Sequence, residues 1–514
     1  MRAKANAEPA LEDKNHDDLP EGWAAATIDD AGHWLTGGTP SRRVNEYFNG
    51  SIPWVKSGDL NDGLVTNTAE KITKVALQNS AARLLPAGTL SIALYGATIG
   101  KLGLLDIQAA TNQACANCIV DANLVDRWYL FYYLLHERQA LIDAGQGGAQ
   151  PNLTNQIVRN WPFILAPLHE QHRIVAKVEE LLENVNASRE RLAKVPKILK
   201  AFRQSVLAAA CSGRLTEDWR DGHTEIEPSS KLLDRILQKR KHLSGRQPCE
   251  PDGTSSLDLP DEWAVKSMDA LTSRITSGSR DWKKYYRDDG PGTFIMAQNI
   301  RPLFFDSSYR LAVAPPQDDR DRARSLVRRG DILVTIVGAN TGDVCRIVFP
   351  IKEHYVCQSV ALMRPVDLET APWLELWLNS PSHGQAQYKT WIYGEGRPHL
   401  SFDNLKATAA ALPPLEEQHE IVRRVEILFK LGHKIEKRVA AATKRADKLT
   451  QAILAKAFRG ELVLTEAELA RQEGRDYEPA SVLLERIKAK RNRAASASKN
   501  GAGRQRRGPN AGKN

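Results

Sequence analysis

The chain has 514 residues, of which 42% are hydrophobic and 26% charged, so it is long enough for several globular domains of ordinary composition. No run approaches about 18 consecutive apolar residues and the N-terminus lacks a secretion signal, which argues against a membrane or secreted protein. The six cysteines are sparse and irregularly spaced, which argues against a disulfide framework and predicts a cytoplasmic protein.

The formal net charge of +9 is concentrated at one end of the chain. The tail 491–514 contains seven Lys and Arg residues and no Asp or Glu, and its small, polar composition predicts disorder. Bulk charge therefore does not identify the globular parts as DNA-binding. The tail is expected to be a solvated segment, with non-specific attraction to phosphates as the alternative.

The chain is an internal repeat. The matching segments are Leu19–Trp23 with Leu259–Trp263, Gly88–Gly100 with Gly330–Gly342, Leu168–Gly213 with Leu415–Gly460, and 227–236 with 478–487. The offset between copies grows from 240 to 247 across the first part of each half and then stays constant up to Gly213 and Gly460. Loops tolerate insertions and packed helices do not, so each half is predicted to be a variable globular unit followed by a helix in strict register.

Each globular unit is predicted to be an α+β domain of about 150 residues. Leu90–Tyr95 and Ile332–Val337 are apolar runs bounded by glycine, as in buried strands, whereas Trp128–His136 and Trp373–Asn379 have a helical pattern. Polar loops in both units combine glycine with basic, amide and hydroxyl side chains, the groups that read bases and phosphates. They are 37–43, 54–59, 146–148, 277–286, 298–301 and 394–397. Ordinary surface loops are the alternative interpretation.

The stretch after each globular unit has the heptad periodicity of a coiled-coil helix. The expected seam positions are Ile174, Val178, Leu181, Val185, Leu192, Leu199, Phe202 and Val206, and in the second copy Ile421, Val425, Leu428, Ile435, Val439, Leu449 and Ile453. Two such helices in one chain most simply pack against each other, although two separate helical bundles are the alternative. Pro196 is expected to kink or split the first helix.

The candidate motifs for catalysis or metal binding are incomplete. The segment Gly96–Leu102 resembles a phosphate loop, but it is one residue too short and lacks the Ser or Thr after Lys101. Cys115 and Cys118 form a single C-x-x-C without a second pair, so zinc is not expected. We find no methyltransferase tetrad, helicase set or nuclease cluster. We therefore expect no catalytic residues, no metal and no cofactor bound by this chain.

With these features in view, the chain resembles the specificity (S) subunits of type I restriction–modification systems. The resemblance covers about residues 19 to 490. It is carried by Leu168–Val175 and Leu415–Val422 at the helix starts, by Phe202–Leu207 with Ser212–Leu215 and Gln451–Leu454 with Arg459–Leu462 at the helix ends, and by Leu19–Trp23 and Ile52–Leu60 at the start of a target recognition domain. Pro196 and the long basic tail depart from the pattern.

The resemblance implies two tandem target recognition domains separated by two long antiparallel coiled-coil helices in a pseudo-twofold arrangement. It divides the chain into 1–18 (polar extension), 19–168 (first recognition domain), 169–245 (first helical region), 246–259 (linker), 260–415 (second recognition domain), 416–490 (second helical region) and 491–514 (tail). Each recognition domain would read half of a split, asymmetric DNA target, and the helices would set the gap between the halves.

The resemblance also implies partners. Two methyltransferase (M) subunits would bind this non-catalytic chain and methylate adenine N6 with S-adenosylmethionine. Restriction (R) subunits would add ATP- and Mg-dependent cleavage for host defence. The alternatives are the recognition subunit of a system whose partner fuses methyltransferase and nuclease, and a coiled-coil scaffold with two protein-binding heads.

The DNA contacts are expected in the polar loops. The candidates are Thr39, Ser41, Arg42, Arg43, Lys56 and Ser57 in the first unit, and Ser279, Arg280, Lys283, Lys284, Tyr285, Gln298, Asn299 and Arg397 in the second. If Arg280 contacts guanine through two hydrogen bonds, its replacement should weaken or relax only the second half-site, by about 1–3 kcal/mol.

Overall fold

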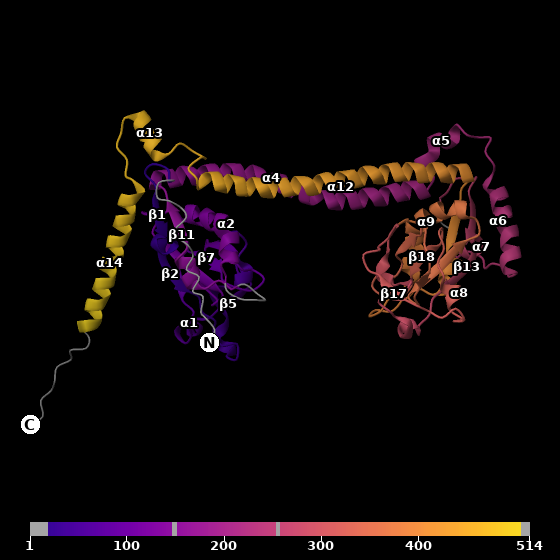
Figure 1. The fold of residues 1–514 in the computed structure, drawn as a ribbon, viewed down its shortest axis with the longest axis horizontal. Helices are drawn as coiled ribbons and strands as arrows, with labels where there is room; N and C mark the ends of the chain where they lie inside the picture. Colours follow the sequence, from indigo (N-terminus) through magenta and orange to yellow (C-terminus); the bar gives the residue numbers. More distant parts are fainter. Residues whose placement is uncertain (1–18, 146–151, 253–257, 505–514) are drawn as a thin grey trace, which may run out of the picture. The chain divides into compact units, whose positions relative to one another are not determined.

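The computed structural model describes residues 19–145, 152–252 and 258–504. The chain forms two compact units: unit 1 comprises 1–192 and 442–514, and unit 2 comprises 193–441 (Figure 1). The N-terminal extension 1–18, the polar loop at 146–148 and part of the linker fall outside the described residues. Within the described ranges, no helix is long and apolar enough to cross a membrane.

Among its described residues, unit 1 contains three β-sheets. The five-stranded sheet has the order β2 (Gly32–Thr36), β10 (Cys115–Val120), β7 (Leu90–Ala93), β8 (Leu102–Leu105) and β4 (Gly63–Val65). The four-stranded sheet is β5 (Glu70–Ile72), β3 (Phe48–Val55), β9 (Ala109–Thr111) and β6 (Leu84–Leu85), and β1 (Ala24–Thr27) pairs with β11 (Pro162–Leu165). The predicted buried strand is confirmed as β7, all four of whose residues are buried.

The globular part of unit 1 before α4 also contains the helices α1 (Lys74–Gln78), α2 (Arg127–Asp143) and α3 (Asn155–Arg159). The predicted helix is confirmed as α2, where the Asp126 carboxylate caps the N-terminus by accepting from the amides of Trp128 and Tyr129. The phosphate-loop-like segment is the turn between β7 and β8, with Gly96 and Gly100 at positive φ.

Unit 2 repeats the mixed architecture with different sheet sizes. Its sheets are β13 (Thr272–Ser277), β21 (Val360–Pro365), β18 (Ile332–Thr335) and β19 (Val344–Arg346); β17 (Leu311–Val313), β14 (Gly292–Ile295) and β20 (His354–Val356); β12 (Ala264–Ser267) with β22 (Ala409–Leu412); and β15 (Ile300–Arg301) with β16 (Phe304–Phe305). Its helices include α7 (Met268–Leu271), α8 (Arg322–Ser325), α9 (Ala371–Asn379), α10 (Gly384–Trp391) and α11 (Phe402–Ala407). The predicted second strand and helix are confirmed as β18 and α9.

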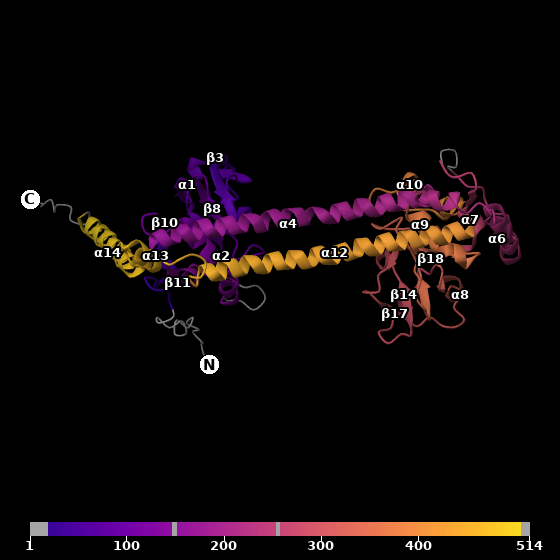
Figure 2. The ribbon, with the colours of Figure 1, turned by 90° about the horizontal axis from the view of Figure 1, so that it is seen from above.

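Two long helices follow the globular parts: α4 (Leu168–Cys211) and α12 (Leu415–Ala457). Within each unit a segment of α4 lies beside an antiparallel segment of α12 (Figure 2). In unit 1 Arg189 pairs with Asp447 at 2.7 Å, and in unit 2 Arg203 pairs with Glu436 at 2.8 Å. The predicted tandem repeat and its coiled-coil helices are therefore confirmed.

The predicted seam is buried most completely near the globular parts. Its buried members are Ile174, Val178, Val185, Leu199, Val206, Ile421, Val425 and Ile453, whereas Leu181, Leu192, Phe202, Leu428, Ile435 and Val439 are half-buried. Leu449 is 51% exposed, so the helical pair of unit 1 does not close completely at that position.

The sequence predicts that Pro196 kinks or splits the first helix. A split does not occur, because α4 runs without interruption from Leu168 to Cys211, and the kink stays a prediction. Proline removes the amide that would donate to the carbonyl four residues earlier, and Pro196 itself is exposed.

The Glu-Gln pair at the start of each long helix fastens that helix to its globular unit. Gln171 and Gln418 donate to the carbonyls of Ala166 and Pro413, both at 2.8 Å. The preceding residues, Glu170 and Glu417, accept hydrogen bonds from the indoles of Trp23 and Trp263, both at 2.9 Å. The repeated motifs at the helix starts and the repeated tryptophans are thus two sides of one contact.

Each long helix is followed by shorter helices. After α4 come α5 (Glu217–Asp221) and α6 (Ser229–Ser244) in unit 2, and after α12 come α13 (Glu466–Glu473) and α14 (Ala480–Arg504) in unit 1. The Ala480 amide donates to the Gly22 carbonyl at 2.7 Å, which joins the two ends of the chain in unit 1. α14 continues to Arg504 and so differs from the disordered tail expected from residue 491. Alanine and the basic residues in this stretch favour helix.

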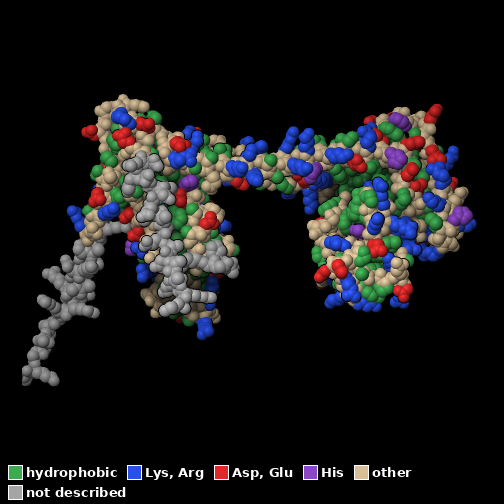
Figure 3. Space-filling view, in the orientation of Figure 1, with side chains coloured by type: hydrophobic (Ala, Val, Ile, Leu, Met, Phe, Trp, Pro, Cys, Tyr) green, Lys and Arg blue, Asp and Glu red, His purple; other side chains and the backbone are tan. Residues whose placement is uncertain are grey.

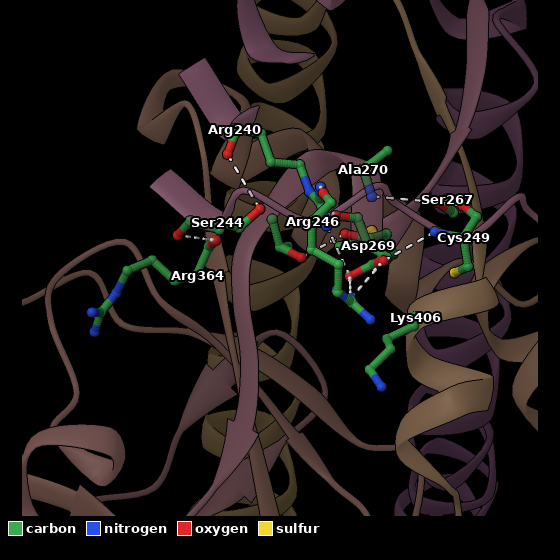
Figure 4. A network of polar contacts seen from close by, with 12 residues as sticks. Arg240, Ser244, Arg246, Cys249, Ser267, Asp269, Ala270, Arg364 and Lys406 are labelled. Atoms are coloured by element: carbon green, nitrogen blue, oxygen red, sulfur yellow. Dashed lines mark hydrogen bonds and ion pairs between the residues drawn. The ribbon is translucent and has the colours of Figure 1, made fainter. Parts of the chain in front are cut away.

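A buried ion pair anchors α6 and the following linker in unit 2 (Figure 4). Asp269 accepts from Arg246 at 2.8 and 2.9 Å and from the Cys249 amide at 3.0 Å, and it lies 3.3 Å from Arg240. Arg240 also donates to the Asp269 carbonyl at 2.6 Å. Arg240 and Asp269 are 3% and 5% exposed, so these hydrogen bonds satisfy charges that burial would otherwise leave unpaired.

Candidate nucleic-acid interface

A glycine begins the first polar loop in both units. Gly37 follows β2 and donates to the Cys115 carbonyl at 3.1 Å, and Gly278 follows β13 and donates to the Cys357 carbonyl at 3.2 Å. A Cβ atom at Gly37 would lie 2.1 Å from the Asn112 carbonyl oxygen, and one at Gly278 would lie 1.4 Å from that of Val356. A side chain does not fit this close to the neighbouring backbone, so both positions require glycine. The polar loop therefore leaves its strand at the equivalent position in both repeats.

In unit 1, Glu70 brings two of the predicted basic residues together. Its carboxylate lies 2.7 Å from Arg42 and 2.6 Å from Lys56. The hydrogen bonds from Arg42 and then Lys56 lower the pKa of Glu70, so this carboxylate is charged at neutral pH. The Arg42 guanidinium also lies over the rings of Phe48 and Trp54, 4.6 and 5.2 Å from their centroids.

The other predicted residues of unit 1 are close to Arg42 or Lys56 in the sequence. Thr39, Ser41 and Arg43 are exposed on the loop that starts at Gly37. Ser57 is half-buried and begins the short helix η4 (Ser57–Asp59), next to Lys56, whose amide donates to Asp59 at 2.8 Å. Unit 1 therefore presents hydroxyls and the exposed Arg43 beside two cations that share a carboxylate.

Unit 2 has a polar cleft of about 520 Å³ beside its glycine turn. Its lining includes Ser277, Gly278, Arg280, Asp281, Arg320, Asp321, Arg324, Gln358, Tyr393 and His399. Lys and Arg side chains are visible along the edge of unit 2 that lies away from α12 (Figure 3). Of the predicted residues, Arg280 lines this cleft, and among the described residues it takes part in no ion pair.

Other predicted residues of unit 2 lie near this region or elsewhere on its loops. Lys283, Lys284 and Tyr285 belong to the short helix η7 (Trp282–Tyr285), and the Lys284 ammonium lies 4.9 Å from the centroid of the Tyr285 ring. Gln298 is exposed in η8 (Ala297–Asn299). Arg397 is exposed in the loop that the paired backbones of Tyr393 and His399 close.

Two predicted residues have structural partners. Asn299 is 1% exposed, and its amide donates to the carbonyls of Asp306 and Tyr309, both at 2.8 Å. Ser279 is 4% exposed and accepts from the Asp281 amide at 3.2 Å. In this arrangement both side chains are buried and hold loops in place.

Sequence reasoning missed Glu70, Arg320, Arg324, Tyr393 and His399. The alternation of Asp and Arg over 318–324 was an available signal for the two arginines. Glu70 offered no local signal, since its partners lie 28 and 14 residues away in the sequence.

Two repeated α+β units with polar loops at matching places, each followed by a long helix, define a duplicated recognition protein. The family model described as "Type I restriction modification DNA specificity domain" matches residues 20–197 and 325–444. The chain belongs to this family, whose members are the DNA-recognition subunits of type I restriction–modification systems.

Individual relatives agree with this assignment. The chain is 34% identical to the type I restriction enzyme EcoBI specificity subunit of Escherichia coli over 379 residues, 72% of each chain. It is 27% identical to the EcoKI specificity subunit of Escherichia coli strain K12 over 503 residues, 94% of this chain and 97% of the relative. A solved chain from work on complex assembly and conformational transition of the type I R-M system shares the fold, with a TM-score of 0.64 and 20% identity over 86% of this chain and 99% of its own.

Proposed function

We propose that this chain binds a bipartite, asymmetric DNA site and directs adenine-N6 methylation and restriction by partner subunits. Unit 1 reads one half-site through the loops around Arg42 and Lys56, and unit 2 reads the other around Arg280. The observation that carries this proposal is the matched glycine turn of the two units, which is followed by different side chains. Equivalent loops with different chemistry favour two different half-sites.

The chain itself supplies recognition, and the chemistry belongs to its partners. Two M subunits bind the chain and hold S-adenosylmethionine, and R subunits hold ATP and Mg. The complex acts on DNA in the cytoplasm. Family membership supports this division of roles, and the side chains near the cleft support it further, because they are arginines, amides and aromatics suited to binding DNA.

The test is to express the full chain with its M subunit and map N6-methyladenine across the host genome. The expected result is one split, asymmetric consensus, of which the half read by unit 2 changes when Arg280 is replaced. A single undivided consensus contradicts the bipartite proposal. If the chain with its M subunit retards neither the cognate nor the scrambled duplex, the protein-binding scaffold is favoured instead.

A further inference from the structure

Arg324 fastens the glycine turn that precedes Arg280. Its guanidinium donates to the carbonyls of Ser277 at 2.9 Å and Gly278 at 3.3 Å, and to the Asp321 carboxylate at 2.8 Å. Three acceptors on two segments thus share one planar group, a geometry that lysine cannot reproduce. Arg324 fixes the start of the loop that presents Arg280.

A second tie joins the same two segments. The Asp319 carboxylate accepts from the indole of the buried Trp282 at 3.2 Å and from the Asp321 amide at 2.9 Å. Segments 277–282 and 319–324 are therefore held together on both sides of Arg280 and Arg320. This places the two arginines in the lining of the same cleft.

The two lining arginines differ from Arg324 in their partners. Arg320 has a side chain 94% exposed and lies 4.0 Å from Asp321, beyond hydrogen-bonding distance. Arg280 is also exposed. Both guanidinium groups therefore retain donors for a ligand, whereas Arg324 donates its hydrogen bonds to other groups of the protein.

The lining of the cleft also includes two rings. Tyr393 and His399 exchange backbone hydrogen bonds at 3.1 and 2.8 Å, and their rings stack with centroids 5.8 Å apart. Tyr393 is 60% exposed. A cleft lined by arginines and by an exposed aromatic ring suits the edges and faces of nucleobases better than phosphate alone.

We propose that Arg280 and Arg320 read two guanines of the half-site recognised by unit 2, and that Arg324 is the positioning residue that aims both. The inference rests on the proposed function and adds the base class and the division of labour among the three arginines. Guanine is the base expected because arginine pairs with its O6 and N7 through two hydrogen bonds.

The experiment uses the full chain with its M subunit and maps N6-methyladenine for R280Q, R320Q and R324A, with the exposed Arg329 off the cleft as the matched control (R329Q). We expect R280Q and R320Q each to relax one guanine of the same half-site, reducing discrimination roughly 10- to 100-fold. R324A should relax both positions, and adding R280Q to it should cause no further loss at the Arg280 position. R329Q should leave the consensus unchanged.

Several outcomes separate the possibilities. An unchanged consensus in R320Q, a relaxed base other than guanine, or equal loss at all sequences, as for phosphate contacts, would overturn the inference. R324K keeps the charge but not the three-way contact, so relaxation confined to the same half-site is expected there too. Wild-type complex without a split consensus would contradict the proposed function itself and not only this inference.

Discussion

The two units differ in how they accommodate one equivalent buried glutamate. Glu170 in unit 1 and Glu417 in unit 2 are both fully buried at the start of a long helix, and each accepts from a tryptophan of its own globular part. Glu417 also accepts from the hydroxyl of Thr216 at 2.8 Å and is paired with Arg220. Glu170 accepts instead from the Glu466 amide at 2.8 Å.

The two repeats therefore share the hydrogen bond from a tryptophan to the buried glutamate, but they differ in how the charge of that glutamate is neutralised. Unit 2 neutralises its buried carboxylate with arginine. In unit 1 burial instead raises the pKa of Glu170 to about 7, although hydrogen bonds from the Glu466 amide and the Trp23 indole lower it, so a proton neutralises this carboxyl increasingly below pH 7. The charges of Arg173 and Glu466 have opposing effects on this pKa.

The largest effect is expected from removing the arginine of unit 2. Arg220→Ala leaves Glu417 buried without a cation, so unit 2 should lose about 3–5 kcal/mol in its free energy of unfolding. Denaturant unfolding, monitored by the hydrogen exchange of backbone amides in unit 2, measures this loss. Arg189→Ala is the control, because its partner Asp447 is exposed and such a pair contributes less than about 1 kcal/mol. A loss for R220A as small as that of the control would remove the contrast between the units.

An intermediate effect is expected in the pH dependence of unit 1. The folded chain keeps a proton on Glu170 up to about pH 7, whereas a glutamate in the unfolded chain releases it near the ordinary pKa of 4.5. The folded state therefore binds more protons between these values, and unit 1 loses stability as the pH rises from 4.5 through 7, by about 2 kcal/mol in total.

The measurement is the free energy of unfolding of unit 1 between pH 5 and pH 8. Glu170→Gln removes the ionisation and should flatten the slope in this window. Carboxylates with lowered pKa values, such as Glu70, are already charged above pH 5 and do not contribute there. A variant that keeps the slope of the wild type shows that another group is responsible.

The smallest effect concerns the loops. In unit 1 Arg42 and Lys56 share Glu70, whereas in unit 2 Arg280 forms no ion pair with the described residues, although Asp281 and Asp321 line the same cleft. Glu70→Gln should free the two cations to contact phosphate and steepen the dependence of log K on log salt by about 1–2 for scrambled duplex. Glu46→Gln on the same unit, whose side chain is exposed, is the control. An unchanged salt slope means that Glu70 does not restrain these cations.

The duplication, the buried strands and the long helices could be predicted because each leaves a regular pattern in the sequence. β7, β18, α2 and α9 arise from runs of apolar residues, and the helical register follows from an offset that does not change. The low helix propensity of proline predicts a split at Pro196, because this rule takes no account of the exposure of Pro196 to water.

The interface was only partly predictable, because its geometry depends on contacts between distant loops. Residue type predicts Arg280, Ser279 and Asn299 alike, whereas the structure exposes Arg280 and buries the other two among neighbours that no local pattern reveals. Arg320 and Arg324 lie in a segment whose alternation of Asp and Arg has no counterpart in the first repeat. Their roles emerge only once Asp319 and Trp282 join that segment to the glycine turn.

The division of the chain into a continuous unit 2 and a discontinuous unit 1 has a consequence for synthesis. A ribosome releases every residue of unit 2 once position 441 has emerged, but unit 1 then still lacks the part of α12 and the helices that cover its core. The half of the protein made second can therefore finish folding first. Unit 1 of the nascent chain cannot complete its core until the final helices leave the ribosome. Until then, the surface that contacts Phe458 and Leu483 stays uncovered.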